Sequence, residues 1–162
     1  MGNRAIGLGD VVTAAVRNLL GNRCFTKAVC AIGTTVQKAR TTATAEYCID
    51  GIMYSKGSTD DLFVFTDLTV QPISTTAFYA LCLDASGNGS VINGTPVSTA
   101  AITAGTAKAY IPEIPGTKCC VGAIKVVTDG TGTFTPATTG LDDAAVTDTY
   151  YNFSCVPTAG HP

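Results

Sequence analysis

The chain has 162 residues, enough for one domain with a substantial buried core. Hydrophobic residues make up 46% of it and charged residues only 14%, against a usual charged share of about 25%. Together with many Thr and Gly residues and no Trp, this composition disfavours a charged, helix-rich protein and favours short strands joined by turns.

A membrane span is not expected, because no stretch approaches the roughly 20 apolar residues that a spanning helix needs. The apolar run after Asp10 is short and is interrupted by Arg17, which disfavours a secretory signal. We therefore expect a soluble protein made in a cytoplasm, with no membrane partner.

The N-terminal residues predict an arm with a short helix. Residues 1–9 contain three glycines and no apolar period, and Asp10 can cap a helix whose apolar residues follow at helical spacing. Gly21 and Asn22 provide the helix end. We predict an arm over residues 1–24 and a β-rich body over residues 25–162.

Charge divides the chain in a similar way. Residues 1–40 carry six basic side chains against one acid, a balance of +5, whereas residues 41–162 carry four lysines against eleven acids, a balance of −7. A basic arm on an acidic body favours contact with another protein or another copy of the chain. Binding to nucleic acid is disfavoured because no aromatic residues alternate with the basic ones, and a solvated basic face remains an alternative.

The rest of the chain alternates with a period of two between turn residues. The predicted strands are 25–32, 44–50, 51–55, 61–70, 77–84, 90–92, 107–111, 120–128 and 149–156. Turns are predicted at Asp50-Gly51, Ser86 to Gly89, Asn93-Gly94, Pro115-Gly116 and Asp129-Gly130. The pattern predicts an all-β fold, an antiparallel β-sandwich or jelly roll with a short N-terminal helix or arm.

Side chains suited to catalysis are few. The single histidine, His161, lies next to the C-terminus, and the carboxylate pairs Asp60-Asp61 and Asp142-Asp143 are expected to form polar turns with diverging side chains. The seven cysteines are an odd number without a secretory signal, which disfavours a disulfide framework and favours buried thiols. No catalytic residue, metal ligand, cofactor or small-molecule substrate is predicted, so we do not expect an enzyme.

One stretch, LDASGNGSVING over residues 83–94, has two interpretations. Asp84, Ser86, Asn88 and Gly89 occupy the first, third, fifth and sixth positions of a calcium-loop pattern. Position twelve, however, is Thr95 rather than a carboxylate, and the flanking residues are strand-like. A β-turn between two strands is favoured, and a weak cation site at Asp84 is the alternative.

Three stretches resemble a known class of protein. They are AEYCIDGIMYSKG (45–57), FYALCLDASGNGSVINGT (78–95) and IPGTKCCVGAIKVVTDGTGTFTPATTGLDD (114–143). Their layout resembles the body of virion structural proteins of tailed bacteriophages, in which a Leu-Asp-x-x-Gly strand opens a hairpin and a VGAIKV-like strand precedes a Gly/Thr-rich loop. The resemblance implies a β-rich body, repeated copies on a capsid or tail surface, and no enzymatic activity.

Among such proteins, the size and charge best match a capsid cement or decoration protein. It would bind the major capsid protein and other copies of itself in the virion, after assembly in the host cytoplasm. Arg4, Arg17 and Arg23 would meet acidic surface. The apolar residues of the arm would fill a groove on a neighbour; they are Val12, Val16, Leu19 and Leu20. The alternative is a tail or head fibre or adhesin module for host recognition, which would expose aromatic or loop-rich patches.

Overall fold

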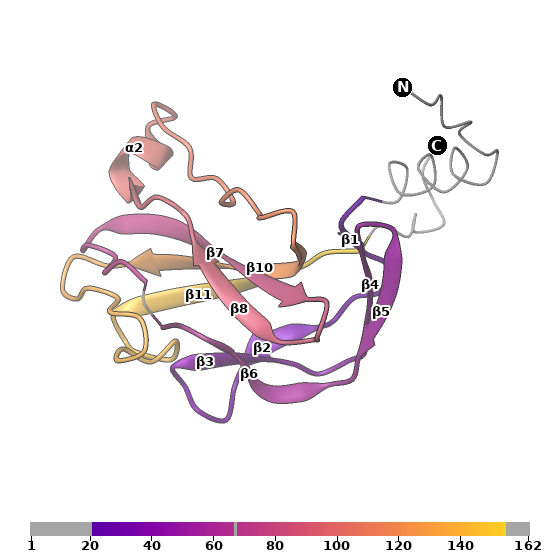
Figure 1. Ribbon diagram of the computed structural model, residues 1–162. Helices are drawn as coiled ribbons and strands as arrows, with labels where there is room; N and C mark the ends of the chain where they lie inside the picture. The colour runs from indigo at the N-terminus through magenta and orange to yellow at the C-terminus, as the bar shows by residue number, and fades with distance from the viewer. Residues whose placement is uncertain (1–20, 67, 155–162) are drawn as a thin grey trace, which may run out of the picture.

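The computed structural model describes residues 21–66 and 68–154. Figure 1 shows strands throughout this part of the chain and one short helix. The elements are β1 (Arg23–Cys24), β2 (Cys30–Ile32), β3 (Lys38–Thr41), β4 (Ala45–Ile49), β5 (Ile52–Lys56), β6 (Thr59–Val64), β7 (Thr75–Asp84), β8 (Gly89–Asn93), β9 (Val97–Ser98), α2 (Thr99–Thr103), β10 (Lys118–Thr128) and β11 (Val146–Asn152). The helix predicted after Asp10 lies outside the described residues.

The strands form three antiparallel sheets packed together, which confirms the predicted all-β sandwich class. The largest has the order β11-β10-β7-β8. β8 and β9 pair with the same edge of β7, β9 near the start of β7 and β8 farther along it. The other two sheets have the orders β2-β3-β6 and β1-β4-β5. In Figure 1 the sheet β2-β3-β6 lies below the large sheet, and α2 with the segment after it lies above.

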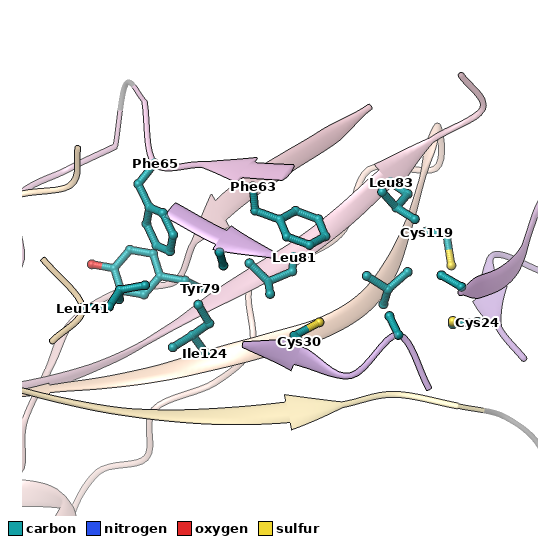
Figure 2. Packing of buried hydrophobic residues seen from close by; sticks show 14 of the residues in the cluster. Cys24, Cys30, Phe63, Phe65, Tyr79, Leu81, Leu83, Cys119, Ile124 and Leu141 are labelled. Carbon is teal, nitrogen blue, oxygen red and sulfur yellow. The ribbon is translucent and has the colours of Figure 1, made fainter. Parts of the chain in front are cut away.

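The core lies between the large sheet and the two smaller ones. Tyr79, Leu81 and Leu83 alternate along β7 and face this core. Figure 2 shows Phe63 and Phe65 on the opposite side of the same cluster. The ring centroids of Phe65 and Tyr79 are 5.6 Å apart, within the usual range for aromatic pairs, and their planes are tilted by 55°. Burial of these side chains on both sides of the gap holds the layers together.

β7 is buried on both faces, as its continuous apolar sequence predicts. Ala80 and Cys82 point away from the core yet are fully buried. By strand alternation they share a face with Thr76 and Phe78, which line a pocket with Ile102 of α2 and Tyr110. The large sheet is therefore a middle layer rather than a surface.

The predicted turn at Asp50-Gly51 is confirmed. Both residues have positive φ, 49° and 76°, and they join β4 to β5 as a two-residue loop. This backbone conformation matches the twist of an antiparallel pair, and Asp and Gly adopt it more easily than other residues.

The strand predictions over 107–111, 25–32 and 61–70 were wrong in whole or in part, and β3 was missed. Residues 107–111 form no strand; they belong to an irregular segment in which Tyr110 is 70% exposed. β2 begins only at Cys30, since Val29 has a φ of 50° that an extended strand does not allow. β6 ends at Val64, and β3 was not predicted because only Ala39 gives it an apolar signal.

Gln71 is a buried polar residue that ties its own segment and the segment at Phe134 to the large sheet. Its side-chain Nε2 donates to the carbonyl oxygens of Thr75 and Val126, each at 3.1 Å, and its Oε1 accepts from the Tyr79 hydroxyl at 3.1 Å. Its backbone pairs with Phe134 in both directions. Every polar group of this fully buried residue has a partner, as a buried amide requires.

We expect Gln71→Met to lower the free energy of unfolding by about 3 kcal/mol, because it removes three buried or part-buried side-chain hydrogen bonds. The Tyr79→Phe variant removes one bond and should cost about 1 kcal/mol. Urea unfolding followed by circular dichroism measures both values. Equal costs for the two variants would contradict the role given to the Gln71 amide.

Candidate functional site

The seven predicted interface residues divide between described and undescribed parts of the chain. Arg23 lies in β1 and is exposed. Arg4, Val12, Val16, Arg17, Leu19 and Leu20 lie outside the described residues. Arg23 and Cys24 form the strand that pairs with β4, so the two residues predicted to end the arm lie in a sheet of the body.

Arg23 lies in one row of side chains across the sheet β1-β4-β5. It pairs with Cys48, which in turn pairs with Met53. Directly paired residues of antiparallel strands project from the same face. Met53 is 53% exposed and its neighbour Ile52 is 50% exposed. Arg23 and Met53 therefore project from one face of this sheet, and Ile52, next to Met53 at the start of β5, projects from the other face. We call Arg23, Ile52 and Met53 together the β5 edge patch.

The opposite face of the same sheet is fixed to the body. The rings of Tyr47 and Tyr54 stack with centroids 5.6 Å apart, and the Tyr47 hydroxyl donates to the backbone oxygen of Asp84 at 2.8 Å. Burial raises the pKa of Tyr47 to about 12, with the nearby Asp84 carboxylate adding to the effect. Tyr47 therefore remains a neutral hydrogen-bond donor and anchors β4 to the end of β7.

β5 is an edge strand. It pairs with β4 on one side, and no strand among residues 21–66 and 68–154 pairs with its other side (Figure 1). An exposed edge with apolar side chains offers unpaired backbone groups to another chain. The β5 edge patch can therefore accept a strand or an apolar segment from a partner.

Asn22 fixes the start of β1 beside this patch. Its side-chain Nδ2 donates to the backbone oxygens of Gly116 and Lys118, and its Oδ1 accepts from the Asp50 backbone N–H at 2.9 Å. Three segments distant in sequence thus meet at one side chain. Gly21, the first described residue, therefore lies next to the β5 edge patch.

The stretch around Asp84 is the turn between β7 and β8, which confirms the favoured interpretation. The Asp84 carboxylate accepts hydrogen bonds from the backbone N–H groups of Ser86 and Asn88, at 2.8 and 2.9 Å, and from the Asn88 side chain at 3.0 Å. Its oxygens are directed to the turn itself. Among the described residues, no group of three or more His, Cys, Asp or Glu side chains could hold a metal ion.

Gly89 in this stretch serves packing between strands. A Cβ placed there would lie 2.3 Å from the backbone oxygen of Leu62 in β6, far inside contact distance. Only glycine allows β8 to approach β6 so closely. The glycine at the sixth position of the calcium-loop pattern is therefore required for packing against β6.

Asp60 and Asp61 were predicted to form a polar turn, and the structure instead places them inside β6. Their carboxylates hydrogen-bond to the backbone N–H and hydroxyl groups of Thr34 and Thr35, respectively, in the loop between β2 and β3. Asp61 has a φ of 51°, which breaks the alternation of an extended strand and turns both carboxylates to one loop. The two carboxylates therefore hold a loop in place.

The predicted turn at Asp142-Asp143 is present between β10 and β11. The backbone N–H of Ala145 donates to the Asp143 carboxylate at 2.9 Å, and the Val146 N–H donates to the Asp143 backbone oxygen. His161 lies outside the described residues.

A second surface with functional character lies above the large sheet. A shallow pocket of about 270 Å³ is lined by Phe78, Tyr110 and Tyr151 together with Lys108 and Lys125, among others. The ring centroids of Phe78 and Tyr151 are 5.9 Å apart, and among the described residues Tyr110 is the most exposed large hydrophobic side chain. Aromatic faces beside ammonium groups suit a ligand with a flat ring and negative charge.

Comparisons with known proteins found no matching family model, curated protein or solved structure. In the described part of the chain, no helix is long and apolar enough to cross a membrane.

We expect Gly89→Ala to lower the free energy of unfolding by about 2 kcal/mol or more, because the added methyl group collides with the β6 backbone. The matched control is Gly57→Ala, where a Cβ meets nothing within 4 Å and the cost should stay within about 0.5 kcal/mol. Urea unfolding of the two variants measures the difference. Equal stability would show that β8 and β6 do not need this close approach.

Stability should also fall in acid because several carboxylates are stabilised as anions. The pKa of Asp84 is lowered mainly by the hydrogen bond from the Asn88 backbone. Hydrogen bonds from the Asn88 side chain and the Ser86 backbone lower it further, and desolvation opposes these effects. Hydrogen bonds from Thr34, Thr35 and Thr131 lower the pKa of Asp60, Asp61 and Asp129, respectively. A lowered folded-state pKa contributes stability that is present above the unfolded value, about 3.9, and is lost as pH falls through the folded value.

The urea midpoint of the wild-type protein should therefore decrease steadily as pH falls below about 4. In the Asp84→Asn variant the midpoint should be lower at neutral pH and should change less in acid, because one stabilised anion is gone. Unfolding curves at a series of pH values measure both slopes. A variant slope as steep as that of the wild type would contradict the role of the Asp84 carboxylate.

Proposed function

We propose that the protein is a structural component of a virus particle, a capsid cement or decoration protein that binds the shell and neighbouring copies of itself. The observation that carries the proposal is the β5 edge patch, an unpaired apolar strand edge next to the point where the basic N-terminal segment joins the body. The three stretches that resemble phage virion proteins support it, since they correspond to the β4–β5 hairpin, the β7–β8 hairpin and β10 with its following loop.

Charge supports contact between copies. The loops between β10 and β11 expose the carboxylates Asp129, Asp142 and Asp143, whereas the exposed cation Arg23 lies in β1. In Figure 1 these loops and β1 lie at opposite ends of the large sheet. A contact between them would join the head of one copy to the tail of the next, which generates rings or extended arrays rather than closed two-fold pairs.

Many weak, identical contacts would then add to the strength of a shell. Each copy held at two or more points binds with a combined affinity that exceeds any single contact. The apolar part of the patch supplies burial, and the charges supply orientation.

The test uses a charge placed in the patch. We expect Met53→Glu to lower binding to capsid shells of the virus that encodes the chain at least tenfold, because it places a carboxylate at an apolar contact. Val29→Glu is the matched control, since Val29 is similarly exposed, at 43%, but lies outside both the patch and the β10–β11 loops. Co-sedimentation with shells measures binding, and analytical ultracentrifugation measures self-association.

Deletion of residues 2–20 should also abolish shell binding while leaving the body folded, because Asn22 and its hydrogen bonds are retained. Normal shell binding by both Met53→Glu and the deletion variant would overturn the proposal.

The exposed aromatic pocket favours a second candidate function, a fibre or adhesin module for host recognition. Tyr110 stands on an irregular segment, as binding residues on recognition proteins commonly do. Binding to host-cell envelopes that survives Met53→Glu and is lost in Tyr110→Ala would support this candidate over the cement protein.

A further inference from the structure

Cys82 of β7 and Cys120 of β10 lie directly opposite each other across an antiparallel pair. Their side chains therefore project from the same face of the large sheet, away from the core side chains Leu81 and Leu83. Directly opposed residues have Cα atoms about 4.5 to 5.5 Å apart, a range that a disulfide spans. Both residues are free thiols in this structure.

Small molecules have access to only one of the two. Cys82 is fully buried, whereas Cys120 is half-buried and lines a pocket of about 420 Å³ with Asn22, Asp50 and Lys118 among its neighbours. The remaining cysteines of the described chain, Cys24, Cys30, Cys48 and Cys119, are at most 4% exposed. A reagent in solution would therefore meet Cys120 first and would reach Cys82 only through it.

The surroundings of the two sulfur atoms assign them different roles. A hydrogen bond from the Cys82 thiol lowers the pKa of Cys120, and backbone hydrogen bonds at Gly122 and Leu81 lower it further, against the effect of burial. In its neutral form the Cys120 thiol donates to the Gly122 backbone oxygen at 3.2 Å. The pKa of Cys82 is raised by the same thiol–thiol bond and by burial. The β-bulge between Cys120 and Gly122 interrupts regular pairing at this position. Cys120 is the thiol that ionises first, and the thiolate is the nucleophile.

We propose that Cys82 and Cys120 are a reversible dithiol–disulfide site, oxidised by a small-molecule disulfide that reaches Cys120 through the pocket.

The exchange proceeds in two steps. The Cys120 thiolate attacks one sulfur of R–S–S–R, a bond forms between Cys120 and that sulfur, and R–S⁻ leaves and takes up a proton. Cys82 then loses its proton and attacks the sulfur of Cys120, which expels the second R–S⁻ to be protonated in turn. Two protein thiols are oxidised to one disulfide, and one small disulfide is reduced to two thiols.

The product would join the two central strands of the large sheet. It closes a loop from residue 82 to residue 120 and so restricts the unfolded chain, the usual source of disulfide stabilisation. The site requires little movement, because the two residues already face each other in register.

The test uses full-length protein carrying Cys155→Ser, since Cys155 lies outside the described residues and is an additional thiol. The folded protein is incubated with oxidised glutathione at mildly alkaline pH, and intact mass and peptide mapping by mass spectrometry identify the products. We expect the loss of two hydrogens and one linked peptide pair containing Cys82 and Cys120, reversed by dithiothreitol.

Two further variants separate the roles. Cys82→Ala in the same background should accumulate one glutathionyl group on Cys120, because the resolving thiol is absent, and Cys120→Ala should slow thiol loss at least tenfold. Cys48→Ala, at a cysteine as buried as Cys82, is the matched control and should oxidise like the parent.

Peptide mapping of the oxidised parent protein tests the proposal even where a variant fails to fold. Folded parent protein that stays reduced, or that links other cysteines, would overturn the proposal.

Discussion

β7 and β10 pair from Asp84 and Lys118 at one end to Thr76 and Val127 at the other, and this contact supports all the surrounding elements. β8 and β9 share the free edge of β7, and β11 lies on the free edge of β10. The core forms on one face of the pair, and residues 104–117 lie over the other. Gln71 adds a polar bond to this arrangement, because its amide reaches Thr75 and Val126 at the two strands. Without this pairing, the smaller sheets and residues 104–117 would lose the surface against which they pack.

The sequence predicted this central part of the fold well and its periphery poorly. β7 and β10 carry apolar residues at most positions, and tight turns such as Asp50-Gly51 depend only on local backbone preference. β3 and residues 107–111 depend on distant neighbours. β3 is a strand because β2 and β6 lie on either side of it, whereas residues 107–111 alternate yet find no strand to pair with.

In the candidate site, too, local sequence signals were predictive and features that depend on distant strands were not. Charge patterning selected Arg23, but Ile52 and Met53 were not singled out, because their exposure arises from the position of β5 at a sheet edge. From the number of cysteines we expected Cys82 and Cys120 to be buried thiols. The strand register of the structure shows that they face each other. Motif spacing gave Asp84 to Gly89 a calcium pattern, although hydrogen bonds in the turn and contact with Leu62 explain the same residues.

The β5 edge also connects the fold to assembly. Natural sheet proteins protect free edges with prolines, inward-pointing charges, bulges or covering loops. β5 has no proline and no bulge in its pairing with β4, and its only charge, Lys56, is at its last position. A strand with two half-exposed apolar side chains would promote unspecific aggregation if it stayed uncovered. The tight turn at Asp50-Gly51 and the Tyr47 anchor hold this edge in a fixed position, which suits a specific partner better than a mobile one. The proposal that this edge is covered in an assembly therefore rests on the same strand pairing that forms the body.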